Sequence, residues 1–356
     1  MASQGPQTTL DRATALASTG IDRSSVINAT IVFISRPKSG TFPAHNSDNS
    51  IFATTALVAT AGIASADVSL SGSAEMGIAG GADAETVFFQ SVDVRFRLTG
   101  ETDNGLSFGA TIDLDDAIES GAGSTRQGLV DVDGGTADFT VFIRGAFGTL
   151  TMGDTDGAFD WAMTEVNAGS PGSINDAETG HAGFNGNSGY DGGFNGQVLR
   201  YDYSIGDLGV AVSAEIDETG ADDAILGLGF RYGFDFAGGS LALGLGYQDS
   251  DTAPDAIIGI SASVELDTGL TATVNYSQLP FDVDHVGLGA SYEFDAFTVH
   301  ANWGRYDTSL GDTDGFGLAA SYDLGGGASL HLGYGDGEVL GVDAGSTWSL
   351  GVAMSF

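Results

Sequence analysis

The chain has 356 residues, of which 56 are Gly and none is Cys, and its net charge is −37. The missing cysteines exclude disulfide scaffolds and thiol catalysis. With 11 basic residues against 48 acidic ones, a nucleic-acid partner is poorly supported, because phosphate binding needs clustered Lys and Arg. No stretch reaches the roughly 18 to 20 apolar residues that a membrane-spanning helix requires. A hydrophobic content of 42% nevertheless argues against global disorder.

The N-terminal part differs from the rest of the chain. Residues 51–66, IFATTALVATAGIASA, have the length of a signal-peptide hydrophobic region and end in the small-x-small form of a cleavage site. The positive charge that normally precedes such a region lies too far upstream. We therefore expect residues 1–50 to be a non-native or disordered N-terminal extension, followed by the signal region at 51–66 and the mature chain at 67–356.

From residue 67 onward, apolar and polar residues alternate with a period of two, which is the pattern of a strand with two different faces. In VDVRFRL (92–98), for example, the apolar residues alternate with Asp93, Arg95 and Arg97. Sixteen segments show this pattern: residues 68–76, 92–98 and 106–114, and segments centred near residues 142, 151, 200, 212, 229, 244, 261, 273, 290, 300, 319, 331 and 352.

The connections between these segments alternate in length. Short links lie at 99–105, 145–149, 205–208, 235–239, 267–269, 294–297 and 323–328. Between them are mostly longer links, acidic or rich in glycine, at 80–90, 115–136, 154–195, 217–223, 249–255, 277–284, 304–314 and 335–346. An even number of strands with short turns at one end and longer loops at the other is typical of an outer-membrane barrel. We therefore expect an all-β, 16-stranded antiparallel transmembrane β-barrel with short periplasmic turns and long extracellular loops.

The aromatic residues distinguish a membrane barrel from a soluble β-sandwich, which the alternation alone does not do. One row lies at the short-turn ends of the strands: Tyr203, Tyr232, Phe234, Tyr292, Phe294, Tyr322 and Phe356. A second row lies at the long-loop ends: Tyr247, Tyr276, Trp303, Tyr334 and Trp348. Two aromatic rows separated by aliphatic residues are expected at the two lipid–water interfaces, whereas a soluble core would scatter its aromatics.

Three segments resemble the general porins of Gram-negative outer membranes, of the alphaproteobacterial type: VRFRLTGETDNGLSFGATIDL (94–114), TVFIRGAFGTLTMGD (140–154) and FGLAASYDLGGGASLHLGYGD (316–336). With the aromatic C-terminus, the resemblance spans residues 67–356. It implies a homotrimer of 16-stranded barrels in which the third long loop folds inward and narrows the pore. It also implies that the terminal strand, ending at Phe356, is the signal read by the outer-membrane assembly machinery.

The third long loop, 154–195, is the longest connection and carries six carboxylates: Asp154, Asp156, Asp160, Glu165, Asp176 and Glu178. Four basic residues lie on the polar faces of nearby strands: Arg95, Arg97, Arg144 and Arg200. In the family that the sequence resembles, a basic cluster on the wall faces acidic residues on the inserted loop. We expect these residues to form the pore constriction, because rings of charged side chains control which ions enter a channel. The alternative is that the arginines bridge neighbouring strands and that the carboxylates are solvated surface charge.

Other polar residues give weaker signals. Arg231, His285, His300 and His331 also lie on polar faces, where a lone histidine more often makes a hydrogen bond to the wall than binds a metal. No cofactor is implied, although clustered carboxylates in the long loops could hold Ca²⁺. The motif GLSFG (105–109) matches a nucleophile pattern but lies within a strand rather than at a strand–turn–helix elbow, so an enzyme is not expected.

We expect a passive diffusion channel for small hydrophilic solutes and ions in the bacterial outer membrane, with a preference for cations because carboxylates concentrate them. The expected partners are further copies of the chain, outer-membrane lipid and lipopolysaccharide, the assembly machinery and the solutes themselves. Two alternatives stay open. One is a substrate-selective channel of the same architecture, for sugars or anions, and the other is a secreted Ca²⁺-binding, adhesin-like β-domain.

Overall fold

The structure is a computed structural model that describes residues 67–81, 84–114, 138–174, 176, 178–194 and 196–356. The expected N-terminal extension and signal region, residues 1–66, lie outside these described residues. Within the described part of the chain, no helix is long and apolar enough to span a membrane.

Strands make up most of the described residues, with one short helix, α3 (Ala158–Ala162). The sixteen strands of the wall are β1 (Asp67–Gly81), β2 (Ala84–Glu101), β3 (Ser107–Leu114), β4 (Asp138–Gly145), β5 (Gly148–Gly153), β6 (Val198–Ile205), β7 (Leu208–Glu215), β8 (Ile225–Phe236), β9 (Gly239–Asp249), β10 (Ile257–Leu266), β11 (Leu270–Leu279), β12 (Val283–Phe294), β13 (Phe297–Thr308), β14 (Gly311–Gly325), β15 (Ala328–Val339) and β17 (Thr347–Ser355). A further two-residue strand, β16 (Val342–Asp343), pairs with the end of β15. Each of the sixteen segments expected from the sequence falls on one strand of the wall.

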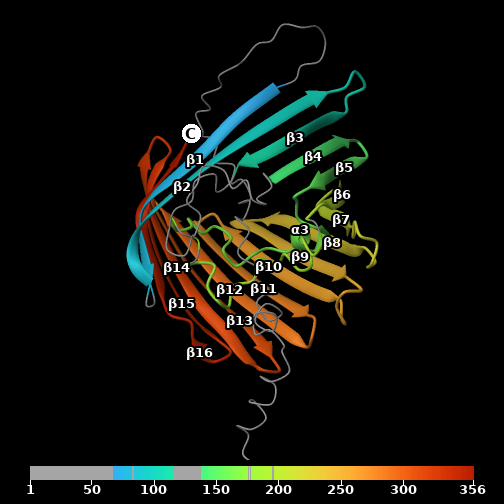
Figure 1. The fold of residues 1–356 in the computed structure, drawn as a ribbon. Coiled ribbons are helices and arrows are strands. Elements are labelled where there is room, and N and C mark those ends of the chain that lie inside the picture. The colour runs from blue at the N-terminus through green and yellow to red at the C-terminus, as the bar shows by residue number, and fades with distance from the viewer. Residues whose placement is uncertain (1–66, 82–83, 115–137, 175, 177, 195) are drawn as a thin grey trace, which may run out of the picture. The chain divides into compact units, whose positions relative to one another are not determined.

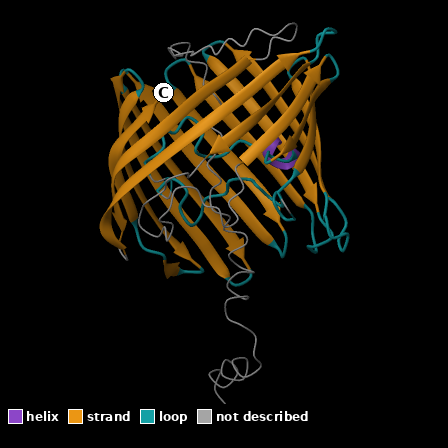
Figure 2. Ribbon diagram, turned by 45° about the horizontal axis from the view of Figure 1, so that its top comes forward, coloured by secondary structure: helices purple, strands orange, loops and turns teal. Residues whose placement is uncertain are grey.

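The sheet closes into a barrel (Figures 1 and 2). Strands that follow one another along the wall pair antiparallel, and β17 also pairs with β1, from Ser73 opposite Ser355 to Gly81 opposite Thr347. At the end of the chain, the Phe356 amide donates to the Gly72 carbonyl at 2.8 Å. Closure pairs the backbone of the first strand with that of the last, as a lipid-exposed sheet requires. The prediction of a 16-stranded antiparallel barrel is confirmed.

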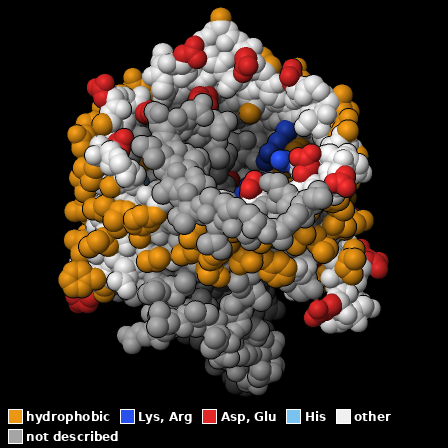
Figure 3. Space-filling view, turned by 90° about the horizontal axis from the view of Figure 1, so that it is seen from above, with side chains coloured by type: hydrophobic (Ala, Val, Ile, Leu, Met, Phe, Trp, Pro, Cys, Tyr) orange, Lys and Arg blue, Asp and Glu red, His pale blue; other side chains and the backbone are white. Residues whose placement is uncertain are grey.

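The two faces of the wall are the reverse of those in a soluble protein. On β13, Phe297 and Val299 are 44% and 39% exposed, whereas His300 and Asn302 on the opposite face are 4% and 3% exposed. The same division recurs along the other strands, and hydrophobic side chains surround the outside of the barrel in Figure 3. Exposed apolar residues outside and buried polar residues inside are expected for a wall with lipid on one side and a wet lumen on the other.

The two aromatic rows are present on the outward face. At the short-turn end, the rings of Phe294 and Phe297 are stacked with their centroids 5.5 Å apart, and Phe297 lies 4.7 Å from Tyr322. At the other end, the Tyr276 hydroxyl donates to the Asp284 carboxylate at 2.7 Å, so its ring faces the apolar band while its oxygen meets a polar group. This is the arrangement by which tyrosine occupies a membrane interface.

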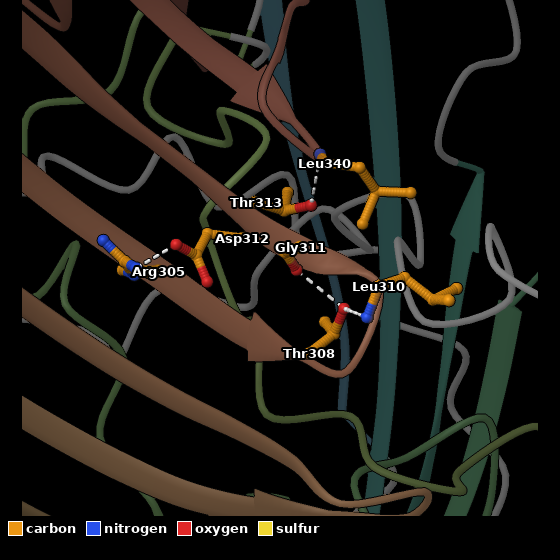
Figure 4. Close-up of polar contacts among 7 residues, drawn as sticks. All are labelled: Arg305, Thr308, Leu310, Gly311, Asp312, Thr313 and Leu340. Carbon is orange, nitrogen blue, oxygen red and sulfur yellow. Dashed lines mark hydrogen bonds and ion pairs between the residues drawn. The ribbon is translucent and has the colours of Figure 1, made fainter.

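Several connections opposite the short turns are shorter than the sequence patterns indicate, because the strands continue past the outer aromatic row. The expected link at 304–314 belongs to β13 and β14 except for residues 309–310. There the Thr308 hydroxyl accepts from the Leu310 amide at 3.1 Å and donates to the Gly311 carbonyl at 2.7 Å, which closes a tight hairpin (Figure 4). Residues 154–197, between β5 and β6, form the longest connection that contains described residues.

Candidate functional site

The connection 154–197, which we call the inlaid loop, lies against the inner face of the wall. Its helix α3 packs against β7, β8 and β9, and Figure 2 shows this helix on the inner side of the strands. The loop then passes over β12 at Val166 and reaches β17 and β1 at Ile174. It returns past β13 and β14 at Gly183 and ends beside Glu215 on β7. The described part of the loop therefore crosses the wall from β7 to β1 and comes back.

Glycines on the wall let the loop backbone approach this closely. A Cβ atom added to Gly289 would lie 1.7 Å from the Val166 carbonyl oxygen, and one added to Gly229 would lie 2.0 Å from that of Ala158. Neither distance is possible for a real side chain, so these positions require glycine. Other wall glycines with a loop carbonyl oxygen within 2.5 Å of an added Cβ are Gly244, Gly304, Gly317 and Gly335. We call these six residues the glycine track.

Side chains of the wall donate hydrogen bonds to carbonyl groups of the inlaid loop. Asn302 donates to Thr179 at 2.8 Å, His285 donates through Nε2 to Gly183 at 3.0 Å, and the Tyr306 hydroxyl donates to Phe184 at 2.9 Å. Ser291, His331 and Asn275 make similar bonds to Ala168, Gly172 and Thr164. A loop packed away from water must have its backbone groups satisfied, and these side chains satisfy them.

Acceptors on the wall hold the returning end of the loop. The Glu215 carboxylate, on a residue only 2% exposed, accepts from the amides of Gly192, Phe194 and Gly196 at 2.9, 2.9 and 3.1 Å. On β9, the Gln248 side chain accepts from the Tyr190 amide at 2.6 Å. Glu215 and Gln248 were not among the residues expected at the site. Their signal was present, because Glu215 is the last residue of β7 and Gln248 the last but one of β9, each on the inward, polar face.

The six loop carboxylates expected at the constriction do not all face the same way. Glu178 has no exposed surface, and it accepts from the hydroxyls of Ser173 at 2.5 Å and Ser349 at 3.0 Å. Burial raises its pKa. Its carboxylate therefore fastens the loop to β17 and does not line the lumen. Asp156 and Asp176 are exposed, and Asp154, Asp160 and Glu165 are partly exposed.

Two of these carboxyl groups have raised pKa values. Burial in the loop raises the pKa of Glu165 to about 7, with a further contribution from the charge of Asp156. Asp176 keeps exposed surface, but the surrounding protein displaces much of the water around its carboxyl group. This desolvation raises the pKa of Asp176 to about 6, and the charge of Asp93 on β2 adds to the shift. A carboxyl group with a pKa near neutrality changes its charge within the physiological range, so the charge of the loop depends on pH.

The four predicted basic residues lie on the inner faces of β2, β4 and β6, and we call them the arginine wall. Arg200 donates to the Asp156 carbonyl at 2.6 Å and has Asp202 at 3.5 Å, so the structure brings it to the inlaid loop. Arg95 instead bridges to Asp113 on β3, with its Nε 2.5 Å from the carboxylate. Arg97 and Arg144 each lie 5.8 Å from the ring of Phe142. Figure 3 shows basic side chains gathered on one side of the opening, next to acidic ones.

A fifth lumen arginine contacts the inlaid loop. Arg231, on the inner face of β8, has its Cζ atom 4.3 Å above the ring centre of Trp161 in α3. The alternation of residues placed Arg231 on a polar strand face but gave no link to Trp161. That pairing depends on the path of the loop, which the sequence pattern does not contain.

The described residues hold no group of three or more His, Asp or Glu side chains placed to bind a metal ion. His181, His285 and His300 lie near one another, but they make hydrogen bonds within the loop and the wall. Burial lowers the pKa of His181 to about 4, with the positive forms of His285 and His300 lowering it further. The histidine is therefore neutral at neutral pH. Ca²⁺ in the long loops stays a prediction.

Comparisons with known proteins agree with this architecture. The model of a family described as "Gram-negative porin" matches residues 53–340. A protein named "Porin" from Rhodobacter capsulatus is 29% identical over 331 residues, which cover 82% of this chain and all of that protein. A porin structure refined at 1.8 Å resolution superposes with a TM-score of 0.61 at 26% identity, covering 82% of this chain and 100% of the other.

A triple mutant of a Rhodopseudomonas blastica porin, at 20% identity and with the same coverage, superposes with a TM-score of 0.57, which supports the fold. The family model covers most of the barrel, and the aligned porins are covered over their whole length. The chain therefore belongs to the Gram-negative porin family and is a general diffusion channel of the bacterial outer membrane.

Proposed function

We propose that this chain is a passive, cation-preferring channel for small hydrophilic solutes, narrowed by the inlaid loop. The observation that carries the proposal is the fastening of residues 154–197 across the inner face of a closed barrel. A loop held by a glycine track and by many hydrogen bonds is a fixed constriction rather than a mobile plug. Solutes must then pass between the loop and the arginine wall.

Cation preference follows from the charge of the chain. Its 48 acidic residues far outnumber its 11 basic ones, and Asp156, Glu165 and Asp176 of the inlaid loop have exposed surface, which we assign to the lumen. Carboxylates in a confined aqueous passage raise the local concentration of cations. We assign the arginine wall the opposing positive side of the constriction, so that the two sides together orient a passing solute.

The two alternatives receive less support. A channel selective for sugars needs a row of aromatic side chains along the lumen, and most exposed aromatics of the described residues lie on the outward face. A secreted adhesin-like domain would need a polar outer surface, whereas here the outward positions are apolar. The described residues also offer no ready metal site for a Ca²⁺-dependent adhesin.

We propose three further partners of the barrel. The first is two more copies of the chain, as a homotrimer. The second is lipid and lipopolysaccharide around the outward apolar band. The third is the assembly machinery, which would read the terminal strand. Phe356 supports this last proposal because its side chain is 78% exposed while its backbone pairs with Gly72. Deleting Phe356 should lower the amount of assembled barrel, measured as heat-modifiable protein in outer-membrane fractions, more than it alters the conductance of barrels that do assemble.

The experiment that tests the proposed function is a planar-bilayer recording of the purified protein in a salt gradient. We expect discrete conductance steps and a reversal potential that indicates cation preference. Absence of discrete steps would contradict a channel, and an anion-directed reversal potential would contradict the charge argument alone.

A further inference from the structure

The two limbs of the inlaid loop meet at one place on the wall. The outgoing limb passes Gly157 just before α3, and the returning limb passes Tyr190 and Asp191. The Asp191 carboxylate joins the limbs, because its Oδ2 accepts from the Gly157 amide, 34 residues away in the sequence, at 2.6 Å. Its Oδ1 accepts from Nε2 of Gln248 on β9 at 2.7 Å. One carboxylate therefore ties both limbs of the loop to the wall.

The Gln248 side chain completes this connection. It has no exposed surface, and its Oε1 atom accepts from the Tyr190 amide at 2.6 Å while its Nε2 group donates to Asp191. A buried amide side chain needs partners for both its donor and its acceptor, and here the returning limb supplies both. We call Asp191 and Gln248 the clasp.

Two glycines leave room for the clasp. A Cβ atom added to Gly157 would lie 2.3 Å from Asp191 Oδ1, and one added to Gly189 would lie 2.3 Å from Gln248 Oε1. Both spacings are too short for a real side chain, so any other residue at either position would push the clasp apart. Gly189 also has a φ of 56°, a left-handed conformation that glycine adopts readily. The sequence of both limbs is thus compatible with a closed clasp.

Apolar packing brings the two limbs together next to the clasp. Phe159 of α3, Met163 and Ile257 form a buried cluster, and Tyr190 of the returning limb packs against it. The Tyr190 hydroxyl also donates to the Asp255 carbonyl at 2.7 Å. Apolar contacts are not directional, whereas charge-assisted hydrogen bonds have a defined geometry. The cluster therefore holds the limbs near each other, and the clasp fixes their relative position.

We propose that the clasp sets the size limit of the pore, a role that rests on the proposed diffusion function. While the clasp is closed, the segment between its limbs, residues 158–190, has both ends fixed to the wall. Holding both ends of a segment restricts its conformations, and releasing one end restores them. When the clasp opens, the returning limb leaves its place and solutes wider than the resting passage can enter. Asp191 is thus a positioning residue of the constriction.

The test measures the entry of two uncharged sugars, the pentose arabinose and the trisaccharide raffinose, by swelling of liposomes that contain the purified protein. Uncharged solutes separate the effect of size from that of charge. We expect the ratio of raffinose to arabinose entry to be low in the native protein and to rise about tenfold in Asp191→Asn. Whichever way the new amide turns, a contact between two donors replaces one hydrogen bond of the clasp. Losing a charge-assisted hydrogen bond shifts an equilibrium by about that factor or more.

Exchanging the two groups of the clasp shows whether its hydrogen bonds are responsible. In Asp191→Asn combined with Gln248→Glu, the new amide still accepts from Gly157 and donates to the new carboxylate. That carboxylate also accepts from the Tyr190 amide, so all three hydrogen bonds are restored and the net charge is that of the native chain. The ratio of raffinose to arabinose entry should return toward the native value.

Gly157→Ala opens the same clasp without changing the charge, because its methyl would lie 2.3 Å from Asp191 Oδ1, and it should give a similar rise. Asp207→Asn removes a carboxylate from the exposed turn between β6 and β7 and should keep the native ratio. Heat-modifiable migration reports the folded barrel in each variant. An unchanged ratio in Asp191→Asn and Gly157→Ala, or a double variant as permissive as Asp191→Asn, would overturn the clasp while leaving the diffusion channel intact. If neither sugar entered through the native protein, the diffusion function itself would fail.

Discussion

The inner surface of the barrel has two regions that differ in their side chains. The region from β8 to β15, together with β17, carries the glycine track and small or neutral hydrogen-bonding residues such as Ser291, Asn302 and His285. The region from β2 to β6 carries the arginine wall. The first region contacts most of the described inlaid loop, whereas the second meets it at Arg200 on β6 and at Phe89 on β2, which packs with Ile174.

The difference indicates what each region must do. A wall that receives a chain segment needs positions without a Cβ atom, so that two backbones can approach, and donors for the carbonyl groups that lose water. A wall that faces a passing solute can instead carry long charged side chains. The inward-facing residues of most strands therefore indicate whether the strand supports the loop or faces the solute. Strand β8 does both, because Gly229 lies under the loop and Arg231 contacts Trp161.

The largest expected effect comes from blocking the glycine track. In Gly289→Ala the added methyl would lie 1.7 Å from the Val166 carbonyl oxygen, so the loop must leave its place. Overpacking of this kind costs about 1–3 kcal/mol. We expect larger and noisier single-channel conductance, because the loop no longer lies against the wall.

The matched control for this variant is Gly233→Ala. Gly233 also lies on the inner face, on β8, but the nearest atom to its added Cβ is the Leu241 carbonyl oxygen at 3.8 Å, an ordinary contact. Its conductance should equal that of the native protein. Equal conductance of the two variants would show that the glycine track does not position the loop.

A smaller effect is expected from removing charge from the arginine wall. Arg97 and Arg144 lie near Phe142 and have no acidic partner among the described residues, so Arg97→Gln with Arg144→Gln removes two positive charges from the inner face. A unit charge about 10 Å from an ion in water changes its energy by about 0.4 kcal/mol, a factor of about two. Cation selectivity, measured as a reversal potential, should rise by about that factor for each charge.

Arg305→Gln is the control for this pair, because Arg305 lies on the outward face and pairs with Asp312. It should leave the reversal potential unchanged. If Arg305→Gln shifted the reversal potential as much as the double variant, the position of the charge would not matter. That result would contradict the claim that Arg97 and Arg144 act because they face the lumen.

The smallest expected effect is a dependence of selectivity on pH. The pKa of Glu165 is about 7 and that of Asp176 about 6, so both carboxyls are mostly charged at pH 8 and mostly neutral at pH 5. Cation preference should therefore fall as the pH is lowered from 8 to 5. Reversal potentials at several pH values measure the change.

Glu165→Gln should remove the part of this change that is centred near pH 7. Glu218→Gln, in the connection between β7 and β8 and outside the inlaid loop, should keep the full pH dependence. A profile that is the same in Glu165→Gln as in the native protein would exclude Glu165 as the titrating group.

The sequence predicted the barrel well because each strand carries its own signal. In β2, the alternation of apolar and polar residues from Val92 to Leu98 is enough to assign the outward and inward faces. Pairing with β1 keeps this assignment. The bounds of the connections were less accurate. Residues 304–314 are polar and rich in Asp and Gly, yet they continue β13 and β14 because the sheet extends beyond the lipid band.

The candidate site was predictable only in part. The position of the third loop followed from the strand count, but its path over the wall did not, so the burial of Glu178 and the pairing of Trp161 with Arg231 were missed. A signal for the path does exist in the sequence. Pairs of glycines two residues apart, such as Gly287 and Gly289, put two open positions on the same face of one strand.

The most direct test of a loop fixed against the wall is a disulfide between the two. The sequence contains no cysteine, so any bond in Ala158→Cys with Gly227→Cys must join these positions. An added Cβ on Gly227 lies 3.3 Å from the Ala158 Cβ, close to the spacing of about 3.8 Å in disulfides. It also lies 2.3 Å from the Ser213 Oγ, so the pair is made together with Ser213→Ala, and the single-channel conductance is compared with that of Ser213→Ala alone. We expect the bond to form on oxidation and to leave the single-channel conductance unchanged, because the loop already lies there. Failure to form the bond in a folded barrel, or a large change of conductance when it forms, would contradict the account.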